Sequence, residues 1–166
     1  MTPAVRPEGD EPMRRLRRAP EHSPSSRPSQ RRSTGRSPVI LIADDSTDTR
    51  ELYAIYFQSR GFSVVTAHDG AAAIQVALDR EPDVIVMDLA MPQFDGITAT
   101  QRIKGDARMS RTRVILLTGY PDSAAERGSV EAGADLFLTK PCLPEDLERH
   151  VNQLRRPNGA LWRHSP

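Results

Sequence analysis

The chain has 166 residues, of which 37% are hydrophobic and 27% charged, which favours one domain with tails over two small domains. Its longest apolar runs, residues 39–43 and 84–87, are far shorter than the ~20 residues that span a bilayer. We therefore expect no membrane insertion and, because no secretion signal is evident, a cytoplasmic location. A single cysteine, Cys142, excludes an internal disulfide and a thiolate zinc cluster.

Residues 1–37 are predicted to form a disordered basic arm. The first 38 residues include seven Pro, six Ser and nine Arg against four acidic residues, and only six apolar side chains. So few apolar groups cannot offset the entropy cost of ordering the segment. The Arg clusters could bind nucleic acid, but the arm has no aromatic residue to stack on bases. A solvated arm is the favoured interpretation, with nucleic-acid binding as the less favoured one.

Residues 38–155, which carry a net negative charge, are predicted to form one domain of alternating strands and helices. The first, third and fourth predicted strands are nearly continuous apolar runs typical of a sheet covered on both faces, whereas the second is more polar and should lie at an edge. The predicted strands cover residues 39–43, 62–67, 84–88, 114–118 and 136–139.

Helices are predicted between these strands over residues 48–60, 71–80, 96–104, 123–132 and 144–154. Gly61 and Gly133 lie where the first and the fourth helix should end. Five right-handed βα units predict an α/β fold with a doubly wound, five-stranded parallel sheet of order 2-1-3-4-5, the flavodoxin-like arrangement. Residues 156–166 are expected to form only a short tail.

Five polar residues lie where the predicted strands end. Asp44 and Asp45 follow the first strand, Asp88 ends the third, Thr118 ends the fourth, and Lys140 follows the fifth. In this strand order the first and third strands are neighbours, so three carboxylates should meet at the carboxyl edge of the sheet. Like charges at close range need a cation, and a hard cation such as Mg²⁺ prefers oxygen ligands.

Most of these residues also have a purely structural explanation. Asp44 and Asp45 could cap the first helix, and Lys140 could be a solvated charge. Asp88 is harder to explain, because an ionised carboxylate after four apolar residues is costly to desolvate without a partner. The placement of all five polar groups at one edge favours a functional site.

Residues 39–154 resemble the receiver domain of bacterial two-component response regulators, the CheY-like family. The resemblance rests on the paired acids in LIADDS and on the segments VIVMDLAMPQFDGI, VILLTGY and LFLTKP, which occur in the family's order and spacing. It implies a phosphoacceptor signalling protein that catalyses only its own phosphorylation and dephosphorylation. The phosphoacceptor would be Asp88, and Mg²⁺ would be held by Asp44, Asp45, Asp88 and the backbone carbonyl of Ala90.

The resemblance also implies a switch. Thr118 and Lys140 would contact the phosphoryl group, and Phe137 would move into the space that Thr118 leaves. The peptide bond between Lys140 and Pro141 would be cis. The implied output surface is the fourth helix, the fifth strand and the fifth helix, which would bind a downstream protein or a second copy in a homodimer. Exposed charges on that surface would be Arg127, Glu131 and Arg149.

The implied phosphodonor is a phosphohistidine on a sensor histidine kinase or a histidine phosphotransfer protein. It would approach along the first helix near Leu52, Tyr53 and Tyr56. We expect a stand-alone receiver without a fused output domain. Two alternatives are a pseudo-receiver that acts only as an interaction module and a haloacid dehalogenase-like phosphatase. The second is disfavoured because its nucleophile lies in a D-x-D pattern on the first strand, where this chain has adjacent acids.

Overall fold

The computed structural model describes residues 35–156, so residues 1–34 of the predicted arm and the tail after residue 156 lie outside it. Strands and helices alternate through the described residues, as expected, and a short 3₁₀ helix at Ala107–Arg111 is an addition. The elements are β1 (Val39–Ala43), α1 (Thr47–Ser59), β2 (Ser63–Ala67), α2 (Gly70–Arg80), β3 (Val84–Asp88), α3 (Gly96–Lys104), β4 (Arg113–Thr118), α4 (Ser123–Glu131), β5 (Leu136–Thr139) and α5 (Pro144–Leu154).

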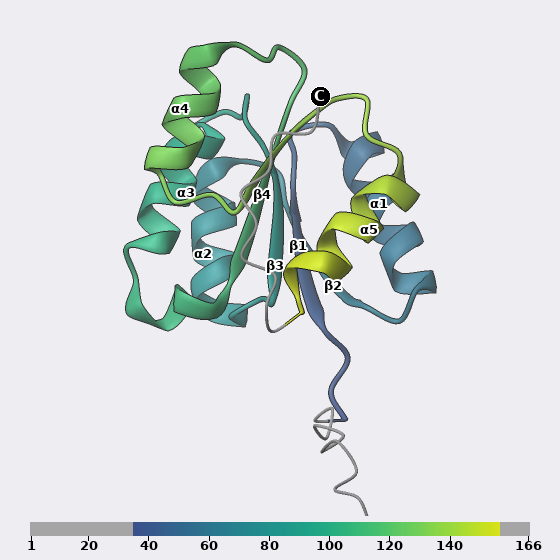
Figure 1. The fold of residues 1–166 in the computed structure, drawn as a ribbon. Helices are drawn as coiled ribbons and strands as arrows, with labels where there is room; N and C mark the ends of the chain where they lie inside the picture. The colour runs from purple at the N-terminus through teal and green to yellow at the C-terminus, as the bar shows by residue number, and fades with distance from the viewer. Residues whose placement is uncertain (1–34, 157–166) are drawn as a thin grey trace, which may run out of the picture. The chain divides into compact units, whose positions relative to one another are not determined.

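The five strands form one parallel sheet of order β2-β1-β3-β4-β5, which confirms the predicted topology and the edge position of β2. Helices α1 and α5 cover one face of the sheet, and α2, α3 and α4 cover the other (Figure 1). Within residues 35–156, none of the helices is long and apolar enough to cross a membrane.

The side chains of the central strands alternate between two apolar cores, one on each face of the sheet. Ile40, Ile42 and Val86 face the core beneath α1 and α5, where they meet Phe57 and Leu147. Leu41, Ile85, Met87 and Leu116 face the other core, with Ala99 and Ile103 of α3. These two cores fix the register of the strands, because a one-residue slip would exchange the two sets of side chains.

Most helices begin with a capping side chain at the carboxyl edge of the sheet. Ser46, Asp69, Asp95 and Asp122 each accept a hydrogen bond from a backbone N–H in the first turn of α1, α2, α3 and α4, respectively. At the opposite ends of α1 and α4, Gly61 and Gly133 adopt φ angles of 87° and 88°. Both glycines therefore end helices, as the sequence predicts.

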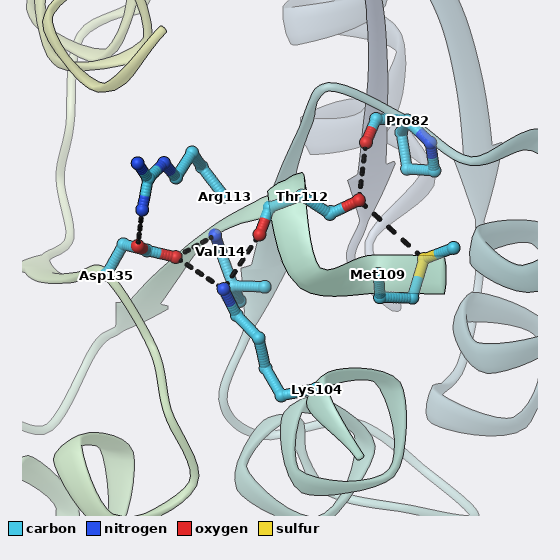
Figure 2. A network of polar contacts seen from close by, with 7 residues as sticks. All are labelled: Pro82, Lys104, Met109, Thr112, Arg113, Val114 and Asp135. Atoms are coloured by element: carbon cyan, nitrogen blue, oxygen red, sulfur yellow. Dashed lines mark hydrogen bonds and ion pairs between the residues drawn. The ribbon is translucent and has the colours of Figure 1, made fainter. Parts of the chain in front are cut away.

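One buried hydroxyl in α3 has no hydrogen-bond partner. Thr100 is 0% exposed, and among the buried side chains of residues 35–156 its Oγ1 alone is unsatisfied. Thr112 provides the contrast, since its buried Oγ1 donates to the carbonyl oxygen of Pro82 at 2.8 Å (Figure 2). An unsatisfied buried polar group lowers stability, whereas a satisfied one does not.

Thr100→Val is therefore expected to raise the free energy of unfolding by about 1 kcal/mol, because it replaces an unpaired hydroxyl with a methyl group of similar size. The matched change Thr112→Val should lower it by about 1 kcal/mol, since the carbonyl of Pro82 then loses its donor. Urea denaturation of both variants measures the two effects. Equal losses in both variants would show that the Thr100 hydroxyl is hydrogen-bonded in solution.

Candidate functional site

The register of the sheet brings the predicted carboxylates together. Ala43 of β1 pairs with Met87 of β3, so the residues that follow each of them are neighbours at the carboxyl edge. One carboxylate oxygen from each of Asp44, Asp45 and Asp88 lies within 4.8 Å of the other two. Asp44 is 2% and Asp88 6% exposed, whereas Asp45 faces solvent. The cluster therefore has two buried members and one that solvent reaches.

Lys140 supplies the positive charge in this cluster. Its Nζ lies 2.8 Å from Asp44 Oδ2 and 2.8 Å from Asp88 Oδ1. Its backbone N–H donates to the carbonyl oxygen of Thr118 at 2.7 Å, which anchors the residue to the end of β4. Burial is the largest single effect and lowers the pKa of Lys140, but the hydrogen bonds to Asp44 and Asp88 together with the charges of these carboxylates outweigh burial and raise that pKa above its ordinary value. Lys140 is therefore a permanent cation between the two buried carboxylates.

Several opposing effects act on the pKa of Asp88. Desolvation raises its pKa, Lys140 lowers it through a hydrogen bond and its charge, and the neighbouring Asp44 and Asp45 raise it again. The net shift is upward, so the fold disfavours a negative charge on Asp88 unless more positive charge is supplied. A cation bound at this edge would supply that charge.

The loop between β1 and α1 is arranged by contacts that sequence reasoning did not identify. Ser46, rather than either aspartate, caps α1, and its backbone N–H donates to Asp44 Oδ1 at 2.9 Å. This leaves the helix-cap explanation for Asp44 and Asp45 without support. The guanidinium of Arg50 donates to the carbonyl oxygens of Asp44 at 2.7 Å and Asp45 at 3.1 Å. The sequence gives no signal that separates Arg50 from the chain's many other arginines.

No side-chain hydrogen bond in the described structure joins Thr118, Phe137 or Ala90 to the three carboxylates. Thr118 is buried at the end of β4, and its Oγ1 accepts a hydrogen bond from the backbone N–H of Tyr120 at 3.1 Å. Phe137 is half-buried and packs against the core beneath α2 and α3. Ala90 is exposed, two residues after Asp88. The predicted roles of these three residues as phosphoryl contact, switch and metal ligand stay predictions.

Gly96, at the start of α3, lies directly against the phosphoacceptor candidate. A Cβ at this position would lie 2.5 Å from the carbonyl oxygen of Asp88, too close for any other residue without a backbone shift. The backbone N–H of Gly96 also donates to the carbonyl of Leu89 at 2.8 Å. The start of α3 at Gly96 could be predicted from the sequence, whereas this close approach to Asp88 could not.

Two other predictions made at the sequence level can be compared with the structure. The Lys140–Pro141 bond is cis, as expected. Leu52 is exposed and Tyr56 half-buried on α1, but the expectation that Tyr53 belongs to the docking face is wrong, because Tyr53 is only 4% exposed and points into the protein. Its position on α1 puts it with Phe57 on the side that packs against the sheet.

The output-surface charges Arg127, Glu131 and Arg149 are all exposed, as expected. Their exposure makes them accessible to another protein, although Arg149 is paired with Asp146 on the same helix, and exposure does not distinguish an output surface from an ordinary solvated one. Their role in output stays a prediction.

The donor set fits a hard divalent cation. Its three side chains offer only carboxylate oxygens, two of them buried and one open to solvent, which is the chemistry that Mg²⁺ prefers. The site could thus hold the ion through carboxylates and still leave coordination positions for water or a phosphate oxygen. The magnesium assignment is compatible with these residues.

The chain is similar to known proteins over the same residues. The response regulator receiver domain is the family whose model matches residues 40–152. The chain is 34% identical over 124 residues to the DNA-binding dual master transcriptional regulator RpaA of Synechocystis sp., covering 75% of this chain and 52% of that protein. It is 32% identical over 121 residues to the phosphate regulon transcriptional regulatory protein PhoB of Pseudomonas aeruginosa, covering 73% of this chain and 53% of that protein.

Solved structures show the same relationship. The chemotaxis response regulator CheY4 of Vibrio cholerae is 27% identical with a TM-score of 0.68, over 72% of this chain and 99% of that chain. The signal receiver domain of a signal transduction histidine kinase from Syntrophus aciditrophicus is 31% identical with a TM-score of 0.67, over 78% of this chain and 96% of that chain. The chain spans about half the length of the curated relatives it matches. Its fold, its acidic cluster and these similarities show that it belongs to the receiver domain family of two-component response regulators.

Proposed function

We propose that this chain accepts a phosphoryl group from a phosphohistidine onto Asp88 in a Mg²⁺-dependent reaction and signals through altered protein contacts. The observation that carries the proposal is the Lys140 ammonium between Asp44 and Asp88, with Asp45 exposed beside them. A pseudo-receiver would not need this complete set of charged groups. The donor would be a sensor histidine kinase or a histidine phosphotransfer protein.

In phosphoryl transfer the protein contributes mainly by positioning the reacting groups and by stabilising charge. An Asp88 carboxylate oxygen attacks phosphorus in line, the P–N bond to the donor imidazole breaks, and the imidazole takes up a proton. Lys140 already touches Asp88 and would stabilise the charge that spreads over the phosphoryl oxygens. Mg²⁺, held by Asp44, Asp45, Asp88 and the carbonyl of Ala90, would supply further charge neutralisation.

The proposed response begins at Thr118. In the described structure its hydroxyl accepts from the Tyr120 backbone and is not committed to the acidic cluster. Rotation toward a phosphoryl group would open a space behind it, which Phe137 would enter from its half-buried position. The resulting change on α4, β5 and α5 would alter contacts with a downstream protein or a second copy of the chain.

Docking of the donor is proposed on the exposed side of α1. Leu52 and Ile55 are 56% and 69% exposed, and Leu143 at the start of α5 is 62% exposed. Neighbouring exposed apolar side chains favour a surface that binds another protein, and Leu52 and Ile55, three residues apart on α1, share one face of that helix. Tyr53 is excluded from this surface by its burial.

The direct test is incubation of the full chain with a small acyl phosphate and Mg²⁺, followed by intact mass measurement. The proposal expects one added phosphoryl group that disappears when EDTA removes the metal. A chain that gains no mass under these conditions, although Mg²⁺ binds, would contradict the proposal.

Metal binding itself should depend on Asp45, the exposed carboxylate of the cluster. Asp45→Asn removes one negative ligand and is expected to weaken Mg²⁺ binding by about tenfold or more. Isothermal titration calorimetry measures the affinity. The matched control is Asp48→Asn, the same change three residues later on the exposed first turn of α1, which should leave the affinity unchanged. Equal affinities in wild type and Asp45→Asn would place the metal elsewhere.

A further inference from the structure

Tyr53 is buried in α1 but reaches a loop of the site. Its hydroxyl donates to the carbonyl oxygen of Cys142 at 2.8 Å, and Cys142 is two residues after Lys140. Burial, with a smaller contribution from Cys142, raises the pKa of Tyr53 to about 12, and the charges of Lys140 and Asp44 are close enough to act on it. The phenol is therefore a permanent hydrogen-bond donor beside the acidic cluster.

The loop that Tyr53 holds has few other attachments besides the packing of the Cys142 side chain against the core beneath α1 and α5. Pro141 is exposed and has no N–H to donate, Leu143 is largely exposed, and α5 begins after Leu143 without a side-chain cap. On the other side of this loop, the N–H of Lys140 donates to the carbonyl of Thr118 at 2.7 Å. The Lys140–Cys142 backbone is thus held at one end by β4 and at the other by the Tyr53 hydroxyl.

The geometry points to Tyr53 as a positioning residue for Lys140: by fixing the carbonyl of Cys142, its hydroxyl holds the lysine backbone so that the ammonium rests against Asp88. A lysine side chain has a flexible four-carbon stem, so its tip is placed accurately only where its backbone is fixed. The inference rests on the proposed phosphorylation of Asp88, because it assigns Tyr53 a part in that reaction.

Tyr53→Phe tests the assignment, because it deletes one hydroxyl and keeps the buried ring. Phosphorylation by a small acyl phosphate at saturating Mg²⁺ is expected to slow about fivefold, the factor that corresponds to one ordinary hydrogen bond. Mg²⁺ affinity should not fall below the wild-type value, because the three carboxylates and their loop are unchanged and a displaced ammonium leaves Asp44 and Asp88 more negative. A merely structural role would reduce both quantities together or neither.

Thr112→Val is the matched control for stability. It also deletes a hydroxyl that donates to a backbone carbonyl at 2.8 Å (Figure 2). This hydroxyl lies just before the start of β4, whereas Asp88 pairs with Leu117 near the other end of that strand. Both variants should lose similar stability, while Thr112→Val keeps the wild-type phosphorylation rate. Equal slowing in both variants would mean that lost stability, and not the Tyr53 hydroxyl, controls the rate.

The chain offers a second readout, because Lys104 and Lys140 are its only lysines. In protein labelled with ¹³C at the lysine ε-carbon, each lysine gives one signal. Lys104 Nζ donates to the carbonyl of Thr112 at 2.7 Å, just before the start of β4. The Lys104 signal is therefore the internal reference for Tyr53→Phe. Tyr53→Phe should shift the Lys140 signal and leave that of Lys104 unchanged, and Thr112→Val should do the reverse.

The two readouts separate failure of this inference from failure of the proposed function. If wild type is phosphorylated and Tyr53→Phe keeps both the wild-type rate and the Lys140 signal, Tyr53 does not position the lysine. If wild type gains no phosphoryl group, the proposed function is wrong. The lysine spectrum alone then decides whether Tyr53 positions Lys140. A shifted Lys140 signal then supports the positioning contact, and an unchanged signal overturns it.

Discussion

Asp88→Asn is expected to abolish the Mg²⁺-dependent gain of a phosphoryl group. The amide keeps the size of the side chain but cannot act as the nucleophile, and the remaining acids, Asp44 and Asp45, are assigned to the metal. Intact mass after incubation with a small acyl phosphate measures the loss. The matched control is Asp83→Asn, directly before β3 and at the opposite end of that strand from Asp88, where Asp83 Oδ2 accepts from the Val39 N–H at 2.7 Å. That variant should be phosphorylated like wild type.

Loss of phosphorylation in Asp88→Asn should not reflect unfolding. Because burial raises the pKa of Asp88 in the folded protein, its contribution to stability is present below the unfolded-state pKa and is lost as the pH rises through the folded pKa. At neutral pH the ionised carboxylate therefore disfavours the metal-free fold, and the neutral amide removes that penalty. Asp88→Asn should be at least as stable as wild type in urea denaturation without Mg²⁺. A labile phosphate on the variant would contradict the assignment of Asp88.

Lys140→Met is expected to lower the free energy of unfolding of the metal-free protein by about 2 kcal/mol. Its ammonium is the group that contacts both Asp44 and Asp88, and without it two buried carboxylates face each other unpaired. This cost is smaller than is usual when one partner of a buried ion pair is removed, because the Lys140 side chain is 28% exposed and solvent screens part of the loss. Saturating Mg²⁺ should recover part of the difference, since it supplies the missing positive charge and binds the folded state.

Lys104→Met is the control for this effect. Lys104 Nζ donates to Asp135 Oδ2 at 2.8 Å and to the carbonyl of Thr112 in a network that also includes Arg113 (Figure 2). Its loss should also lower the free energy of unfolding. Mg²⁺ should stabilise Lys104→Met and wild type equally, so the difference between the two should stay the same with and without the metal. Urea denaturation with and without Mg²⁺ distinguishes the two lysines. A Lys140→Met deficit that Mg²⁺ does not reduce would show that the lysine and the metal do not act on the same carboxylates.

The fold and the acidic cluster could be predicted because they depend on local patterns and one rule of topology. Nearly continuous apolar runs for the central strands and the glycines at helix ends define the elements. Once β1 and β3 are neighbours, Asp44 and Asp88 must meet at the carboxyl edge. Lys140 follows in the same way from the end of β5. The structure adjusts the element boundaries by only a residue or so.

Other features could not be predicted because they depend on contacts between residues distant in sequence. Tyr53 looks like a docking residue next to Leu52, and only the packing of α1 against the sheet shows that it faces inward. Its partner carbonyl lies 89 residues later, beyond any sequence period. Likewise, the unpaired hydroxyl of Thr100 and the contact of Gly96 with Asp88 depend on the final positions of α3 and β3.

The most direct test of the account is to locate the phosphoryl group in the wild-type chain. Borohydride reduces an acyl phosphate to an alcohol, so a phosphorylated aspartate is recovered as homoserine, and peptide mass spectrometry identifies the position. After treatment with an acyl phosphate and Mg²⁺, the account predicts homoserine at residue 88 and unmodified aspartate at 44 and 45, with no homoserine when EDTA is present. Homoserine at residue 44 or 45, or none at residue 88 in a chain that has gained the phosphoryl mass, would contradict it.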